Sequence, residues 1–288
     1  MIQYLYLGRV AYDVALKLQA ELVELRYQGR IGNVLLLLEH PPVLTLGRNA
    51  NRANVLASDE MLAARGVTLH QINRGGDVTY HGPGQLVGYP IFDLRTLRNV
   101  HPSDQDLSPG NASTIRRMGP VDFVRRMEEA LIRLCGVYGV RAGRIPDLTG
   151  VWCGVSEPQI SSSESKKIGA IGIHVSRGIT SHGFAFNVTT NLEDFRLINP
   201  CGITDKPVTS LEREVTSPDK VPPLQDIADQ AARQFGLVFN EHILAVESLE
   251  ALRAQAGPSK PPMPEDTPLQ VPRELERLRG NIEPPTRA

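Results

Sequence analysis

The cysteine at position 201 has the residue type and the surroundings of a nucleophile. Cys201 lies between Pro200 and Gly202, which indicates a turn rather than the interior of a helix or strand. A cysteine attacks as its thiolate, and a free cysteine has a pKa of about 8.5, so a neighbouring cation is needed for efficient reaction at neutral pH. The alternative is that Cys201 is a small buried apolar residue. Cys135 and Cys153 lie in apolar stretches and are expected in the core.

A lysine at position 167 is a candidate for that cation. Lys167 stands where the polar, serine-rich stretch 156–166 gives way to the apolar stretch 168–173. An ammonium group beside a thiol stabilises the thiolate, and a partly desolvated lysine also exchanges protons with a substrate amine. The alternative is a solvated lysine at the entrance of a strand. Because side chains alternate along a strand, Lys166 is expected to point the other way.

The glycine-rich segment from Arg74 to Gln85, RGGDVTYHGPGQ, is a third candidate element. Glycines let backbone amides approach a ligand closely and permit positive φ angles. The segment has neither the GxGxxG spacing of a dinucleotide site nor the GK[ST] ending of a P-loop. The alternative is a glycine-rich hairpin without a ligand. His174 and His182 lack a carboxylate pattern around them, so neither a metal nor a cofactor is expected.

Hydrophobic periodicity predicts the helices and strands that must position these residues. The expected helices are 13–26, 59–64, one that begins at Pro120, and 224–235, and the expected strands are 34–38, 43–46, 67–72, 151–154, 168–176 and 179–188. Arg177-Gly178 between the last two strands predicts a hairpin, and short strands around tight turns are expected between residues 74 and 94. This mixture predicts an α/β or α+β domain with a mixed β-sheet.

Composition limits the classes of function. The chain has 288 residues, of which 41% are hydrophobic and 22% charged, and its formal net charge is −1. Without an excess of basic residues, neither nucleic acid nor a membrane is an expected partner. No apolar run approaches the roughly 20 residues of a membrane-spanning helix, and the first residues lack the pattern of a secretory signal. Three cysteines without a CxxC pair argue against a disulfide framework, and a reduced, cytoplasmic setting is expected.

Five segments, in the same order along the chain, resemble those of the lipoyl(octanoyl) transferases. These segments are HPPVLTLGR at 40–48, RGGDVTYHGPGQLVGYP at 74–90, KIGAIG at 167–172, HGFAFNV at 182–188 and PCGI at 200–203. Any one motif is moderately specific, and five in order are very specific. The resemblance extends from about residue 2 to residue 240.

The resemblance implies a fold, an activity and a set of site residues. The implied fold is the catalytic domain shared by biotin and lipoate protein ligases, a mixed β-sheet with helices packed on one side. The implied activity is octanoyl transfer from octanoyl-acyl carrier protein to a lysine of a lipoyl domain, with 2-oxoacid dehydrogenases and the glycine cleavage H protein as acceptors. The family's nucleophile falls on Cys201 and its lysine partner on Lys167. Its acyl-binding residues fall on Arg74, Gly75, Gly76, Asp77, Val78, Thr79, Tyr80, His81, Ala170, Ile171, Gly172, Gly183, Phe184 and Ala185.

Domain boundaries and two insertions follow from the same reading. Residues 1–250 are expected to form the catalytic domain, and the proline-rich stretch 251–288 is expected to be a disordered tail. The stretches 96–119 and 156–166 are longer than the family needs. The second of them ends beside Lys167 and is either a lid or inert.

Two other functions remain open. The first is an ATP-dependent lipoate or biotin protein ligase on the same fold, in which Lys167 contacts the adenylate and Cys201 has no clear task. The second is a non-catalytic protein that binds lipoyl domains or acyl carriers. A requirement for ATP and free octanoate would identify the ligase, and binding without turnover would identify the binding protein.

Overall fold

A large mixed sheet runs through the centre of the molecule. The computed structural model describes residues 1–99, 116–154, 165–199 and 206–257. Within these residues, eight strands form one sheet in which β13, β1 and β2 are parallel and the other neighbouring pairs are antiparallel. In spatial order the strands are β13 (Ile243–Ala245), β1 (Ile2–Arg9), β2 (Asn33–Glu39), β6 (Gln85–Ile91), β12 (Ile179–Asn187), β11 (Lys166–Ser176), β10 (Leu148–Cys153) and β9 (Ala142–Ile145). The predicted mixed sheet is confirmed.

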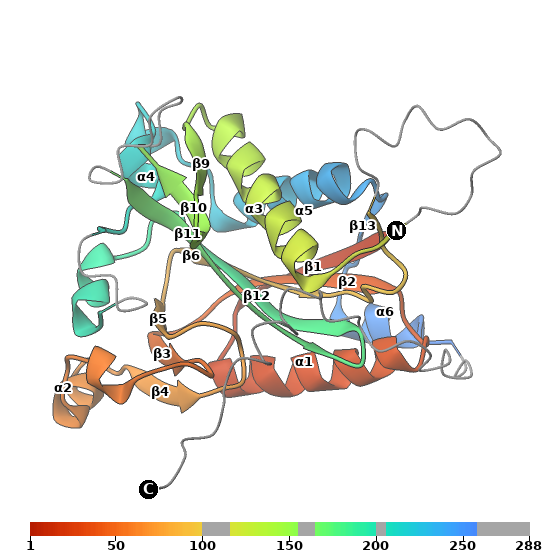
Figure 1. Cartoon of the computed structure of the whole chain (residues 1–288), viewed down its shortest axis with the longest axis horizontal. Helices are drawn as coiled ribbons and strands as arrows, with labels where there is room; N and C mark the ends of the chain where they lie inside the picture. Colours follow the sequence, from red (N-terminus) through yellow and green to blue (C-terminus); the bar gives the residue numbers. More distant parts are fainter. Residues whose placement is uncertain (100–115, 155–164, 200–205, 258–288) are drawn as a thin grey trace, which may run out of the picture.

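Helices cover both faces of this sheet (Figure 1). On one face lie α3 (Pro120–Val137) and α5 (Leu224–Phe239), and on the other lie α1 (Tyr12–Tyr27) and α6 (Leu249–Ala254). Strand β2 shows why two layers are needed. Leu35 and Leu37 belong to the apolar cluster with α3 and α5, whereas Leu36 and Leu38 belong to the cluster with α1. The expectation of helices on one side only is therefore corrected, because a strand that is apolar on both faces must be covered on both.

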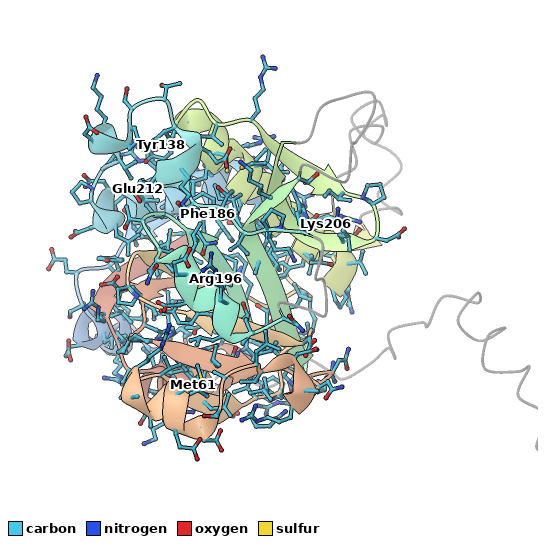
Figure 2. The ribbon with its side chains drawn as sticks, turned by 90° about the vertical axis from the view of Figure 1, so that its left-hand side faces the viewer. Met61, Tyr138, Phe186, Arg196, Lys206 and Glu212 are labelled. Carbon is cyan, nitrogen blue, oxygen red and sulfur yellow. The ribbon has the colours of Figure 1, made fainter. Side chains whose placement is uncertain are left out.

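A small sheet beside the main one supports the glycine-rich segment Arg74–Gln85. Its strands are β4 (Thr68–Gln71), β3 (Val43–Leu46) and β5 (Val78–His81), in that spatial order. Helix α2 (Asp59–Ala64) precedes β4 and begins at Ser58, whose hydroxyl accepts a hydrogen bond from Met61 N. The 3-10 turns η1 (Arg52–Asn54) and η3 (Leu192–Leu197) lie beside the small sheet. Leu44 and Tyr80 of the sheet and Phe195 of η3 belong to one buried apolar cluster. Figure 2 shows this unit with Met61 at its surface.

The hairpin predicted at Arg177-Gly178 is present. Strands β11 and β12 pair antiparallel up to this turn, where Ser176 lies opposite Ile179. Arg177 and Gly178 have φ angles of 51° and 80°, which suits a two-residue hairpin loop. Helix α5 continues past its predicted end at residue 235 as far as Phe239, and its cap, Asn240, is left-handed with φ 52°.

The other described elements are short. They are β7 (Arg98–Asn99), β8 (Arg116–Arg117), α4 (Leu211–Glu214) and η5 (Pro218–Lys220). Most of the two predicted insertions and residues 258–288 of the predicted tail lie outside the described residues. The expected tail boundary at residue 251 falls within α6, where Leu252 is buried. Within the described ranges, no helix has both the length and the apolar character that crossing a membrane requires.

Candidate functional site

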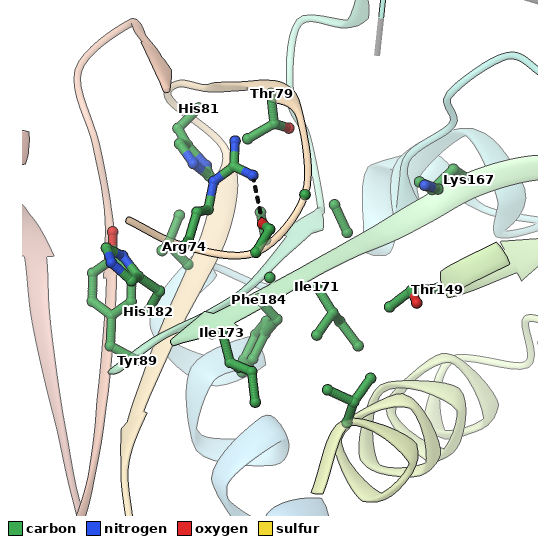
Figure 3. A pocket seen from close by; sticks show the side chains of 18 of the residues that line it. Arg74, Thr79, His81, Tyr89, Thr149, Lys167, Ile171, Ile173, His182 and Phe184 are labelled. Carbon is green, nitrogen blue, oxygen red and sulfur yellow. Dashed lines mark hydrogen bonds between the residues drawn. The ribbon is translucent and has the colours of Figure 1, made fainter. Parts of the chain in front are cut away.

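The edge of strand β11 shapes the candidate site. Strand β10 pairs with β11 as far as Gly169, so in the described structure the next residues, Ala170–Ile173, pair as strand only with β12. On the open side, Gly75 N donates to Ile173 O at 2.9 Å. A cavity of about 510 Å³ surrounds this edge, within the range of roughly 300–1,000 Å³ that is usual for ligand sites. Figure 3 shows its lining on both sides of the β11 ribbon.

Most of the residues expected to bind the acyl group line this cavity. They are Arg74, Gly75, Gly76, Val78, Thr79, His81, Ala170, Ile171, Gly172, Gly183, Phe184 and Ala185. Asp77 and Tyr80 are not part of the lining. Asp77 accepts a hydrogen bond from Asn51 N at 3.1 Å, and the Tyr80 hydroxyl donates to Asp194 at 2.9 Å. These two side chains bind the small sheet to its own loops, which explains their separation from the cavity.

Arg74 is a nearly buried cation, with 9% of its surface exposed. Its Nη2 donates to the carbonyl oxygen of Thr45 at 2.8 Å and to the Thr45 hydroxyl at 3.0 Å. Its Nη1 donates to Gly75 O at 3.0 Å, the bond drawn in Figure 3. Because Thr45 lies in β3, the small sheet fixes the Arg74 loop (Arg74–Asp77) against β11.

Glycine is needed where the Arg74 loop approaches the main sheet. A Cβ atom at Gly172 would lie 2.7 Å from Gly75 O, closer than real contacts allow. Gly76 has a φ angle of 89°, which side chains other than glycine rarely adopt. The glycines singled out in the sequence therefore allow backbone to pack on backbone at the cavity wall.

Lys167 lies at the start of β11 and lines the cavity. Its Nζ is 4.5 Å from the ring centroid of Trp152. Its backbone is tied to a later part of the chain, since Lys167 N donates to Pro207 O and Lys167 O accepts from Thr209 N, both at 2.9 Å. Lys166 points elsewhere and pairs with Glu214 at 3.3 Å, as the strand alternation predicted.

Cys201 and the rest of the PCGI motif lie outside the described residues. The chain just before the motif is anchored, because Asn199 N donates to Asn54 O at 2.7 Å. Cys135 and Cys153 are buried, as predicted, and both are free thiols. Burial raises the pKa of Cys153 to about 12 and also raises the pKa of Cys135. Both of these thiols therefore stay protonated near neutral pH.

A hydrogen-bond chain fixes the tautomer of His81. Gln85 Nε2 donates to Tyr80 O at 3.2 Å and to Asn187 Oδ1 at 2.9 Å, so Gln85 Oε1 must accept from His81 Nδ1–H at 2.7 Å. Asn187 in turn donates to Thr209 O at 2.9 Å. This series of hydrogen bonds leaves His81 Nε2 as an acceptor. It also connects the cavity wall to Thr209, in the segment that bonds to the Lys167 backbone.

Three buried histidines in this region, His40, His81 and His182, are neutral at pH 7. Burial lowers the pKa of His81 to about 3 and the pKa of His40 and His182 to about 4. His40 Nδ1–H donates to Val10 O at 2.7 Å, and its Nε2 accepts from the Tyr89 hydroxyl at 2.7 Å. His81 and His182 line the cavity, and their neutral rings keep this part of its wall compatible with an apolar ligand.

These histidines predict a loss of stability on acidification. Each has a lower pKa in the folded chain than its value of about 6.5 when unfolded, so the unfolded chain binds more protons as the pH falls below about 6.5. From pH 7.5 to pH 5, His40 and His81 should each lower the free energy of unfolding by roughly 2 kcal/mol, which urea denaturation at the two pH values measures. His40→Gln should reduce this pH dependence, and His242→Gln, a change at an exposed residue, should not. Equal pH dependence in all three proteins would contradict the assignment.

A buried carboxylate on α3 holds strand β10 beside Lys167. Glu128 is fully buried; its Oε1 accepts from Gly150 N at 3.0 Å, and its Oε2 accepts from Arg125 at 2.8 Å and Arg144 at 3.1 Å. A Cβ atom at Gly150 would lie 3.4 Å from Lys167 Cε. Glu128 therefore holds the start of strand β10 against the lysine side chain.

Removing this carboxylate should destabilise the fold. Glu128→Ala is expected to lower the free energy of unfolding by about 3 kcal/mol, since a buried amide and two guanidinium groups lose their acceptor. Glu129→Ala is the matched control on the same helix. Glu129 is 33% exposed and pairs with Arg133 and Arg144, so its loss should cost less than about 1 kcal/mol. Urea denaturation of both variants checks the difference, and equal costs would show that Glu128 has no special structural role.

Part of the lining was not predicted from the sequence. The cavity is also bordered by Tyr12 of α1, Val121 and Val124 of α3, and Thr149 of β10. His182, considered only as a weak metal ligand, also lines it and bonds through Nε2 to Asn73 Oδ1 at 2.8 Å. Its position just before Gly183 in the HGFAF segment was the available signal. Among the described residues, no three His, Cys, Asp or Glu side chains are grouped to hold a metal ion.

The chain is similar to known proteins over most of its length. The family model of the lipoyl protein ligase A/B catalytic domain matches residues 11–236. An octanoyltransferase of Acidobacterium capsulatum is 56% identical over 248 residues, which cover 86% of this chain and 94% of that protein. An octanoyltransferase of Koribacter versatilis is 50% identical over 278 residues, covering 96% and 97%.

Solved structures share the fold at much lower identity. A bipartite lipoate protein ligase from Thermoplasma acidophilum has a TM-score of 0.60 at 17% identity, covering 89% of this chain and 91% of that one. A lipoate-protein ligase A bound with ATP has a TM-score of 0.55 at 18% identity, covering 89% and 93%. At these identities the likeness supports the architecture, and the chemistry must come from the residues of the site.

Proposed function

This chain belongs to the octanoyltransferases of the lipoyl protein ligase A/B catalytic-domain family, acyltransferases of protein lipoylation, and we propose that it transfers the octanoyl group through a thioester on Cys201. The main support is the position of Lys167. Its side chain lines the cavity, while its backbone holds Pro207 and Thr209, which follow the cysteine motif in the chain. A cation at this point suits the activation of a thiol.

In the first half-reaction, the Cys201 thiolate attacks the carbonyl carbon of octanoyl-acyl carrier protein. The bond between that carbon and the carrier sulfur breaks, and the octanoyl group remains on Cys201 as a thioester. The Lys167 ammonium stabilises the attacking thiolate and then gives a proton to the departing carrier thiolate. Lys167 is left neutral.

In the second half-reaction, the lysine amine of a lipoyl domain attacks the same carbonyl carbon. Neutral Lys167 accepts the proton that this nitrogen must lose as the amide forms. The carbon–sulfur bond breaks, and Cys201 leaves as a thiolate beside the restored ammonium. The first step exchanges one thioester for another, and the second converts a thioester into a more stable amide, so the transfer needs no ATP. Lipoyl domains of 2-oxoacid dehydrogenases and the glycine cleavage H protein are the proposed acceptors.

The buried part of the cavity is the proposed acyl site. On the side of β11 that faces the Arg74 loop, the lining includes Val87, Tyr89 and Ala185, all buried, together with the neutral rings of His81 and His182. Each buried methylene contributes about 0.8 kcal/mol, so an eight-carbon chain gains several kcal/mol here.

The test is to incubate the full chain with octanoyl-acyl carrier protein in the absence of ATP and to take its intact mass. A gain of one octanoyl group that hydroxylamine removes, followed by its transfer to an added lipoyl domain, is the expected result. Lipoyl-domain modification that requires ATP and free octanoate, with no adduct, would instead establish a ligase. Binding of the lipoyl domain without turnover under either condition would establish a non-catalytic binding protein.

A further inference from the structure

The cavity continues past the acyl site onto the other face of β11. There the side chains of Ile171 and Ile173 lie on the α3 side of the ribbon (Figure 3), packed against the apolar cluster of α3 and α5. Val121 and Val124 of α3 complete an apolar wall. Val121 is 73% exposed, so this half of the cavity opens to solvent. We call it the α3 groove.

The α3 groove also has polar groups along one side and at its opening. Asp147 of the β9–β10 turn and Thr149 of β10 line it next to Lys167. Arg125, one helical turn after Val121, lines it as well; its guanidinium bonds to Glu128 at 2.8 Å, and half of the side chain is exposed. The groove thus combines an apolar wall with a hydroxyl, a carboxylate and a cation.

A thioester substrate needs two binding sites, one on each side of its reacting carbonyl carbon. Its acyl chain must be buried, whereas the chain on its sulfur must lead out to the carrier. We propose that the α3 groove binds the pantetheine arm of the acyl donor, the chain of methylenes and two amides that ends in the thioester sulfur. This inference rests on the proposed function, since it assumes that a thioester is the donor.

The chemistry of the groove fits this arm. The methylenes and methyl groups of pantetheine match Val121, Val124 and Ile171, and its amides match the hydroxyl of Thr149. The phosphate at the far end of the arm carries negative charge, to which the half-exposed guanidinium of Arg125 is complementary. An acceptor lysine has only a short methylene stem and attacks after the carrier has left, so it does not need this groove during loading of the enzyme.

The test compares two donors that carry the same octanoyl thioester. Octanoyl-phosphopantetheine has the whole arm, and octanoyl-N-acetylcysteamine has only the part next to sulfur. Initial rates of octanoyl-enzyme formation, followed by intact mass at low donor concentration, are measured for the wild type, Val121→Asp and Val124→Asp. Val137→Asp is the control, because Val137 lies at the far end of α3 and is 48% exposed.

In the expected result, both groove variants load at least about tenfold more slowly from octanoyl-phosphopantetheine, which corresponds to about 1.4 kcal/mol of lost binding. They load from octanoyl-N-acetylcysteamine within about twofold of the wild-type rate, and Val137→Asp matches the wild type with both donors. Val121 is exposed, so its variant should fold even if Val124→Asp does not.

Three results would overturn the inference. Equal losses with both donors would place the groove in the acyl site, and normal loading from both donors with normal transfer would leave the groove without a role in either half-reaction. Normal loading combined with slow transfer to the lipoyl domain would assign the groove to the acceptor. Failure of the wild type to load from any donor would refute the proposed function itself, and the inference with it, which separates that outcome from the other three.

Discussion

Cys201→Ala is expected to lose the octanoyl adduct completely and to slow octanoyl transfer to a lipoyl domain by at least about a thousandfold. In the proposed mechanism the Cys201 sulfur is the atom that holds the acyl group between donor and acceptor, so no step proceeds without it. Intact mass after incubation with octanoyl-acyl carrier protein measures the adduct. The mass of an added lipoyl domain over time measures the transfer.

Cys153→Ala is the matched control for this substitution. Burial keeps the Cys153 thiol protonated, so it is a poor nucleophile, and its loss should leave both the adduct and the transfer in place. Cys201→Ser should also lose the thioester, because a serine hydroxyl is far weaker than a thiolate as a nucleophile. An adduct of full yield on Cys201→Ala, removable by hydroxylamine, would show that the acyl group is held elsewhere.

The sequence predicted the local elements well because their signals are local. The expected strand at 43–46 and helix at 59–64 have the same bounds in the structure. The predicted hairpin turn is also present at Arg177-Gly178, and both of its residues have positive φ angles. The second helical layer was not predicted from pattern or from family. Its cause, the two-sided burial of residues 34–38, is visible in the sequence as a continuous apolar run.

The sequence likewise predicted only part of the candidate site. The motifs identified the Arg74 loop and the β11–β12 residues, and the similarity to octanoyltransferases confirms the family that they indicated. Motif reading treated Arg74–His81 as one continuous segment, whereas alternation and loop contacts take Asp77 and Tyr80 away from the cavity. Glu128 and Val124 were missed because helical spacing locates a buried face but does not say which distant segment packs against it.

Lys167→Ala is expected to slow formation of the octanoyl-enzyme by about a hundredfold at pH 7, the usual size of a general acid–base contribution. Without the ammonium, the Cys201 thiol should return to an ordinary pKa of about 8.5. The rate in the variant should therefore rise with pH up to about pH 9, because the thiolate fraction then increases without help. The rate of alkylation by iodoacetamide, measured against pH, reports the ionisation of this thiol directly.

Two further variants separate a role in the chemistry from a role in the fold. Lys167→Arg keeps a positive charge but can neither release nor accept a proton near neutral pH, so it should keep the low thiol pKa in the alkylation profile while slowing both half-reactions. Lys166→Ala is the control at the neighbouring position, since the Lys166 side chain pairs with Glu214 and is absent from the cavity lining. It should leave the alkylation profile and both half-reactions unchanged. If Lys167→Ala and Lys166→Ala slowed loading equally, the strand rather than the Lys167 ammonium would account for the effect.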